Sequence, residues 1–204
     1  MLTIGLIGGI ASGKSTVAEM LADCGAVVLN ADKVAHEVLN SPEVRTLLVN
    51  RWGPGILYPD ESINRSAIAR QVFGKSTQAV EERKYLESVV HPRTRLLLEE
   101  HRDQLAIQGH NVFIIDAPLL LEAGWDTECD MVLMVKASDE RRIENAARRG
   151  WSVDELNRRE DAQLPLATKR HRADVAIENS GTLAETREQV AIFWNEVVVP
   201  QLGD

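Results

Sequence analysis

A glycine-rich loop followed by Lys14 and Ser15 carries the clearest chemistry in this sequence. Residues 8–15 read GGIASGKS, which fits the phosphate-loop pattern G-x-x-x-x-G-K-[ST] between an apolar run at 2–7 and a helical pattern after Lys14. Gly8 and Gly13 allow the backbone N–H groups to approach phosphate oxygens. Lys14 adds a positive charge, and the Ser15 hydroxyl suits Mg²⁺. The sequence therefore predicts a site for a nucleoside triphosphate and Mg²⁺.

Two carboxylates follow later strand-like runs. Asp32 comes shortly after the run 26–29, and we expect it either to accept a proton from a substrate hydroxyl or to cap a helix starting at Lys33. Asp116 closes the run 112–115 and fits either a water-mediated Mg²⁺ contact or a turn before Pro118. Spacing alone leaves both alternatives open for each residue.

Five strand-like runs alternate with helical stretches, at 2–7, 26–29, 112–115, 131–135 and 175–177. Continuous apolar strands that alternate with helices are typical of a parallel sheet covered on both faces. Ligands in such sheets bind at the carboxyl ends of the strands. We therefore predict an α/β fold of the P-loop NTPase type, with a five-stranded parallel sheet and helices on both faces.

Two long stretches interrupt this alternation within what we expect to be a single domain, 1–204. Residues 32–103 read as a helical substrate-binding insertion, and 138–172, broken at Gly150 and Pro165, as a mobile helical lid. The core would then comprise about 1–31, 104–137 and 173–204. His91-Pro92 is typical of a helix start, and a closing helix over 182–198 would pack Leu183 and Ile192 into the core along with Val190, Phe193 and Val197.

The composition indicates which kinds of partner the protein can bind. The 204 residues carry a net charge of −8, which argues against extended nucleic-acid binding. Residues 138–172 depart from this balance, with nine Lys and Arg against seven Asp and Glu, which suits a small anionic ligand. The two cysteines, Cys24 and Cys129, lie in no metal or disulfide pattern, and no leader or membrane span is evident. We expect a cytoplasmic protein with no membrane partner; the sequence does not reveal its oligomeric state, and a monomer is assumed.

Two absent motifs argue against one class of nucleotide-binding protein. The D-x-x-G and N-K-x-D strings of guanine-nucleotide switches do not occur in the chain. A small-molecule kinase and a non-catalytic nucleotide-binding module remain. The insertion and lid favour the kinase, because phosphoryl transfer to a small acceptor needs a closed, water-poor site.

Several motifs in order resemble the dephospho-coenzyme A kinase family along nearly the whole chain. They are the stretch 5–16, Asn30-Ala31-Asp32, His91-Pro92, the run PLLLE at 118–122, Gln163, and the stretch 173–181, ADVAIENSG. The phosphate loop is shared by many families, whereas the runs at 118–122 and 173–181 are much narrower. An alternative is another small-molecule P-loop kinase, such as a nucleoside monophosphate kinase.

The resemblance implies transfer of the ATP γ-phosphoryl group to the ribose 3′-hydroxyl of dephospho-CoA. It implies catalytic roles for Asp32 as general base, for Lys14, and for Arg149 among the lid arginines. ATP would bind Gly9, Ala11, Ser12, Gly13, Lys14, Ser15, Thr16 and Asn179, with Ser15 also on Mg²⁺. The acceptor would meet Asp32, His91, Pro118, Leu119 and Glu122. Two departures are Asn30, where the family commonly has Asp, and Asn145, where a lid arginine is expected; Arg141, Arg142 or Arg148 could supply the missing cation.

Overall fold

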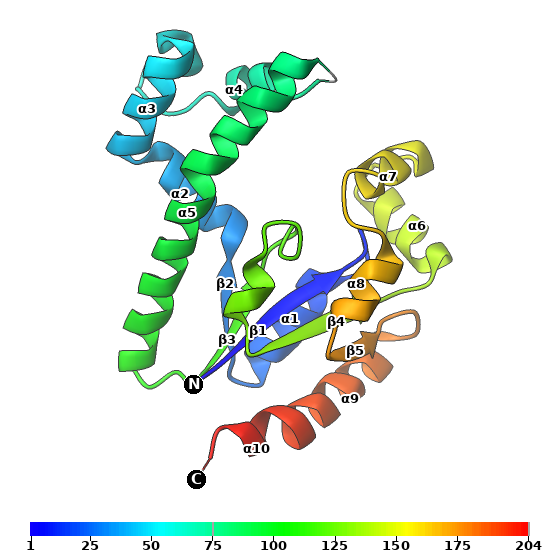
Figure 1. The fold of residues 1–204 in the computed structure, drawn as a ribbon. Helices are drawn as coiled ribbons and strands as arrows, with labels where there is room; N and C mark the ends of the chain where they lie inside the picture. Colours follow the sequence, from blue (N-terminus) through cyan, green and yellow to red (C-terminus); the bar gives the residue numbers. More distant parts are fainter. Residues whose placement is uncertain (75, 204) are drawn as a thin grey trace. The chain divides into compact units, whose positions relative to one another are not determined.

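The computed structural model describes residues 1–74 and 76–203. Contacts divide the chain into two compact units. The first comprises Met1–Asn30 and Gln104–Asp204, and the second comprises Ala31–Asp103. Each unit is described by itself below (Figure 1).

The first unit is built on a five-stranded sheet whose strands are all parallel. The order is β2-β3-β1-β4-β5, with bounds β1 Leu2–Gly8, β2 Val27–Asn30, β3 Val112–Asp116, β4 Met131–Lys136 and β5 Val175–Glu178. The predicted α/β class and parallel sheet are confirmed. Each strand continues one residue beyond its predicted end, because Gly8, Asn30, Asp116, Lys136 and Glu178 still pair through their backbones.

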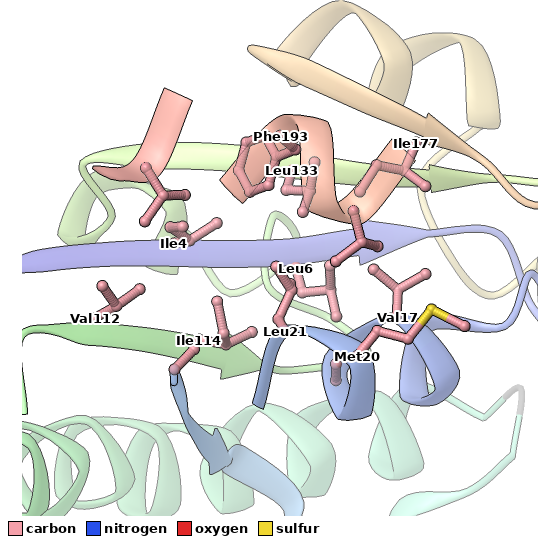
Figure 2. Packing of buried hydrophobic residues seen from close by; sticks show 14 of the residues in the cluster. Ile4, Leu6, Val17, Met20, Leu21, Val112, Ile114, Leu133, Ile177 and Phe193 are labelled. Carbon is pink, nitrogen blue, oxygen red and sulfur yellow. The ribbon is translucent and has the colours of Figure 1, made fainter. Parts of the chain in front are cut away.

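One face of the sheet packs against α1, Lys14–Asp23, and α9, Leu183–Phe193. Figure 2 shows Ile4 and Leu6 of β1 among the side chains that these two helices contribute. All seven residues of β1 are buried, which explains its uninterrupted apolar sequence. The central strand that leads into the phosphate loop is therefore held rigidly in the core.

The opposite face is covered by the segment after β3 and by α8. A Cβ added to Gly5 would lie 2.8 Å from Cys129 Sγ and 3.0 Å from Leu120 Cδ1, so a glycine is needed for this close approach. The segment includes a 3₁₀ turn, Trp125–Glu128. Both cysteines are free thiols, and burial raises the pKa of Cys129 to about 12.

The stretch predicted as a lid forms three helices: α6 Asp139–Arg148, α7 Val153–Glu160 and α8 Leu166–Arg172. Ser138 and Ser152 cap the first two through side-chain oxygens that accept from Arg141 N and Glu155 N. Gly150, with a φ of 76°, and Pro165, the N-cap of α8, lie at the two breaks. Both interruptions therefore fall where glycine and proline stand in the sequence.

The second unit is helical. It contains α2 Ala31–Asn40, α3 Pro42–Trp52, a 3₁₀ turn Pro54–Ile56, α4 Arg65–Val72 and α5 Thr77–Ile107, whose last residues fall in the first unit. Its own apolar cluster includes Val44 and Leu48 of α3, Ile68 of α4 and Val89 and Val90 of α5. The unit thus has a core separate from that of the sheet.

Two expectations about helices are wrong. His91-Pro92 does not begin a helix but lies in the interior of α5. The closing helix covers the predicted residues, as α9 followed by a π-helical turn, Trp194–Val198, and then a short α10, Val199–Gln201, but the burial expected for two of its side chains is wrong. Val190 and Phe193 are buried as expected, but Leu183 and Ile192 are 59% and 49% exposed, because Leu183 lines a cavity at the start of α9 and Ile192 lies outside the core cluster. Among the described residues, none of the helices is both long and apolar enough to cross a membrane.

Candidate active site

The phosphate loop lies between β1 and α1 and has an unusual backbone. Ala11 and Gly13 have φ values of 60° and 91°, and Ser12 N donates to Gly9 O at 3.2 Å. Gly13 is the residue before the first turn of α1. Positive φ values turn successive N–H groups toward one side of the loop, which is the arrangement that binds anions. The loop therefore has the backbone needed to hold phosphate groups.

Asn179 supports this loop from the end of β5. Asn179 is buried, with 5% exposure. Its Nδ2 donates to Ser12 O at 2.8 Å, and its Oδ1 accepts from Thr186 Oγ1 at 2.8 Å. A Cβ at position 13 would collide with Asn179 Nδ2. Gly13 is thus required both by its φ value and by the approach of Asn179.

Asn145 ties α6 to the same loop. Its Nδ2 donates to Ala11 O at 2.9 Å, across 134 positions of sequence. Where an arginine is expected by resemblance, this chain has an amide that braces the strained residue of the loop. The side chain therefore has a defined role that its sequence position does not reveal.

A cavity of about 330 Å³ lies beside the start of α1. Its lining includes Gly13, Thr16 and Asn179 together with Arg141 and Arg148 of α6 and Arg149, the C-cap residue of that helix. Arg149 is exposed at the end of α6, with its guanidinium 5.5 Å from the centre of the Trp151 ring. The cavity thus combines the end of the phosphate loop with several positive charges, which suits a nucleotide.

Arg142 differs from these arginines because it is buried, with 6% exposure. Its guanidinium pairs with Asp139 at 2.7 Å and also with Glu160, joining α6 to the end of α7. It lies close to the phosphate loop, since a Cβ on Gly9 would be 3.3 Å from Arg142 Nη1. Two carboxylates already neutralise this charge, so we favour the cavity-lining arginines as cations for a phosphate.

The carboxyl ends of β2 and β3 carry polar side chains in register. Asn30 pairs with Asp116, and Asp116 pairs with Leu6 of β1. Asp32 lies in the first turn of α2, which begins at Ala31. The alternative that Asp32 is the cap of a helix starting at Lys33 is therefore wrong. Asp32 and His91 both belong to the second unit, and their approach to the phosphate loop stays a prediction.

The residues present fit a Mg²⁺ ion that arrives with a nucleotide. Ser15 is exposed in the first turn of α1, and Asp116 is half-buried at the end of β3. Mg²⁺ characteristically takes one or two protein oxygens and completes its shell with waters and phosphate oxygens. No group of three or more acidic, His or Cys side chains forms a metal site among the described residues, and this ion does not require one.

Comparisons with known proteins agree on one family. A sequence model described as dephospho-CoA kinase matches residues 2–185. The dephospho-CoA kinases of Corynebacterium jeikeium and Geobacillus kaustophilus are each 40% identical to this chain, over 95% and 93% of it and 98% and 93% of their own lengths. The chain belongs to the dephospho-CoA kinase family. Its enzyme class is that of a kinase, a transferase.

Solved structures support the same assignment. A Thermus thermophilus protein superposes with a TM-score of 0.80 at 35% identity, covering 100% of this chain and 98% of that one. The Campylobacter jejuni dephospho-CoA kinase gives 0.63 at 26% identity, covering 95% and 96%. The shikimate kinase of Acinetobacter baumannii, at 16% identity and a TM-score of 0.52, shares the fold alone. The P-loop kinase fold is thereby confirmed, and a nucleoside monophosphate kinase is not favoured.

The family motif at 118–122 makes contacts that the sequence does not predict. Pro118 and Leu119 are exposed, whereas Glu122 Oε1 accepts from Leu164 N at 2.8 Å and pairs with Lys169 Nζ at 3.3 Å. Glu122, expected to bind substrate, therefore has protein partners from the α7–α8 region. Whether it also touches the acceptor stays a prediction.

The family motif at 173–181 is also more structural than its position suggests. Asp174 Oδ2 accepts from Val132 N at 2.7 Å, which joins the start of β5 to β4. The Ser180 hydroxyl and then Lys136 hold the pKa of Glu178 below its usual range. Sequence reasoning missed Thr186 and Lys169, because the contacts that give them a role, from Thr186 to Asn179 and from Lys169 to Glu122 and Gln163, reach outside the helices that carry them.

Proposed function

We propose that this protein transfers the γ-phosphoryl group of ATP to the ribose 3′-hydroxyl of dephospho-CoA, giving coenzyme A and ADP. This reaction is the last step of coenzyme A biosynthesis. The observation that carries the proposal is the braced phosphate loop, with Asn179 on Ser12 O and Asn145 on Ala11 O, in a member of this family. Such bracing preorganises the N–H groups for phosphate before ATP arrives.

The nucleotide half of the site is formed by the phosphate loop and the cavity beside it. Backbone N–H groups of Gly9, Ala11, Ser12 and Gly13 would surround the phosphates, and Lys14 would hold the transferring group. Thr16 and Asn179 line the cavity of about 330 Å³ in which we place the rest of ATP. Asn179 acts there chiefly as the support of the loop, because its Nδ2 already donates to Ser12 O.

Ser15 would hold Mg²⁺ on the bound ATP, and Asp116 is our second choice through a water molecule. The ion would offset the negative charge of the β and γ phosphates. Arg149, on the rim of the cavity, would add a second positive charge toward the phosphoryl group during transfer. Its contact with Trp151 keeps this long side chain from ranging freely.

The acceptor half would be formed by the helical insertion and the loop after β3. We propose that Asp32 takes the proton of the 3′-hydroxyl while that oxygen bonds to the γ-phosphorus and the bond to the ADP oxygen breaks. His91, Pro118, Leu119 and Glu122 would border the acceptor. The exposed side chains of Pro118 and Leu119 support this role, since they are open to a ligand.

The setting of the enzyme is a further part of the proposal. The net charge of −8 supports a small-molecule acceptor rather than a nucleic acid. The two free thiols support a reducing compartment, and we propose a monomeric enzyme of the cytoplasm.

The test is Asp32→Asn, which keeps size and removes the proton acceptor. We expect turnover with Mg·ATP and dephospho-CoA, followed by mass spectrometry, to fall by about 10² to 10⁴-fold. The dissociation constant for ADP should stay within about twofold, because the P-loop does not include Asp32. Asp103→Asn, an exposed carboxylate of the same unit, is the control and should keep full turnover. An active Asp32→Asn enzyme would exclude Asp32 as the base, and an inactive wild type would send us to other acceptors, nucleoside monophosphates first.

A further inference from the structure

Lys169 is a buried charge that the roles proposed above do not use. Lys169 belongs to α8 and is 2% exposed. Its Nζ donates to Gln163 Oε1 at 2.7 Å and pairs with Glu122 Oε1 at 3.3 Å. Removing an ammonium group from water is costly unless partners with good geometry compensate. Because both partners come from outside α8, satisfying this charge fixes where those segments lie.

The two segments are a loop and a strap on either side of Lys169. The acceptor loop is residues 118–122, which ends in Glu122, and the lid strap is residues 161–165, which connects α7 to α8 and contains Gln163. Glu122 Oε1 also accepts from Leu164 N of the lid strap at 2.8 Å. The same carboxylate oxygen therefore contacts both the strap and the Lys169 ammonium. Removing Glu122 would leave the buried Lys169 ammonium with the neutral Gln163 and no negative partner.

The lid strap borders the phosphate loop. A cavity of about 400 Å³ is lined by Gly9 and Ile10 of the phosphate loop, by residues of the strap, and by Lys169 itself. Leu166, directly after the strap, packs so closely that a Cβ on Gly9 would lie 3.1 Å from its Cδ2. The position of the strap therefore sets the space next to Gly9 and Ile10 of the phosphate loop.

We propose that Lys169 is a positioning residue for phosphoryl transfer. Its ammonium joins Glu122 of the acceptor loop to Gln163 of the lid strap, and so fixes the side of the site where the acceptor nucleotide is held. The inference rests on the proposed function, since it assigns the loop to the acceptor. In this proposal Lys169 acts through Glu122 and Gln163, and not by contact with a reactant.

Lys169→Met tests this role, because methionine keeps most of the volume and removes the charge. We expect kcat/KM for dephospho-CoA to fall by about 10 to 100-fold, the size of effect that a misplaced reactant produces. The dissociation constant for ADP should change less than about twofold, because Asn179 and Asn145 brace the phosphate loop independently of Lys169. Arg158→Met, which removes a lid charge that is 72% exposed, is the control and should keep wild-type kinetics.

Substitutions of Gln163, which the proposed function does not place against a reactant, separate positioning from a general loss of structure. Gln163→Glu keeps an oxygen that can accept from Lys169 and should retain kcat/KM within about threefold. Gln163→Ala should lower kcat/KM for dephospho-CoA as Lys169→Met does, and the double variant should be no worse than Lys169→Met, because both act through one network. If Lys169→Met does not fold, the Gln163→Ala and Gln163→Glu pair carries the same comparison.

Three results would overturn the proposal: unchanged kinetics in Lys169→Met, a parallel loss of ADP affinity and thermal stability, or effects that multiply in the double variant. A wild-type enzyme that ignores dephospho-CoA would instead reject the proposed function. The two failures are therefore distinguishable.

Discussion

At the scale of single residues, Gly13 shows how backbone angle and packing act at one position. Its φ of 91° lies in the left-handed region, and a Cβ there would also meet Asn179 Nδ2. Gly109 has a similar φ of 95° with no atom within 4 Å of an added Cβ. The two glycines therefore separate the cost of the backbone angle from the cost of the contact.

We expect Gly13→Ala to weaken ADP binding on the order of 10-fold or more, because Asn179 must move off Ser12 O. It should also lower the free energy of unfolding by more than Gly109→Ala, for which only the backbone cost of about 1–2 kcal/mol applies. Urea unfolding and ADP titration of both variants measure the difference. Equal losses in the two variants would show that the Asn179 contact contributes nothing.

Some residues of the site can be recognised from the sequence, and others only from the structure. The phosphate loop is recognisable because its glycines, Lys14 and Ser15 are contiguous. The support given by Asn179 to Ser12 joins residues 167 positions apart, and the bond from Asn145 to Ala11 spans 134. Contacts of this kind depend on the fold as a whole, so spacing alone did not predict them.

At the scale of elements, the strands were predictable and α5 was not. Each strand is an apolar run buried in a parallel sheet, which the sequence shows directly. Pro92 favours a helix start by local rules, yet α5 continues through it. Val89 and Val90 before the proline, and Thr94 and Leu98 after it, are all buried, so packing on both sides holds one helix together.

Pro92→Ala should therefore stabilise the insertion. Alanine restores an N–H that can donate to the Ser88 carbonyl and removes the ring clash, for a gain of about 1–3 kcal/mol. We also expect kcat/KM for dephospho-CoA to fall severalfold with ADP affinity unchanged, because the new hydrogen bond and the loss of the ring alter the helix backbone next to His91. Lys84→Ala, at an exposed position of α5, is the control. A variant that is no more stable than wild type would contradict the argument.

At the scale of the whole molecule, the two units have separate cores. The cluster around β1, α1 and α9 contains only residues of the first unit, and the cluster of α2, α3, α4 and α5 contains only residues of the second. Each unit can therefore lose stability by itself. The proposed function also assigns separate roles to the two units: the first binds the ATP phosphates, and the second carries Asp32 and His91.

Leu48 and Leu133 test this independence, since each is 0% exposed and lies in a different core. Substitution of either by alanine should cost about 2–5 kcal/mol. We expect Leu48→Ala to speed hydrogen exchange in α2, α3 and α4 while ADP affinity and exchange in the sheet stay unchanged. Leu133→Ala, in β4, should weaken ADP binding and speed exchange in the sheet.

Saturating Mg·ADP should then slow exchange in the first unit of both variants, because a ligand stabilises only the unit that binds it. If Leu48→Ala weakens ADP binding as much as Leu133→Ala, the two units open together and nucleotide binding depends on the integrity of both.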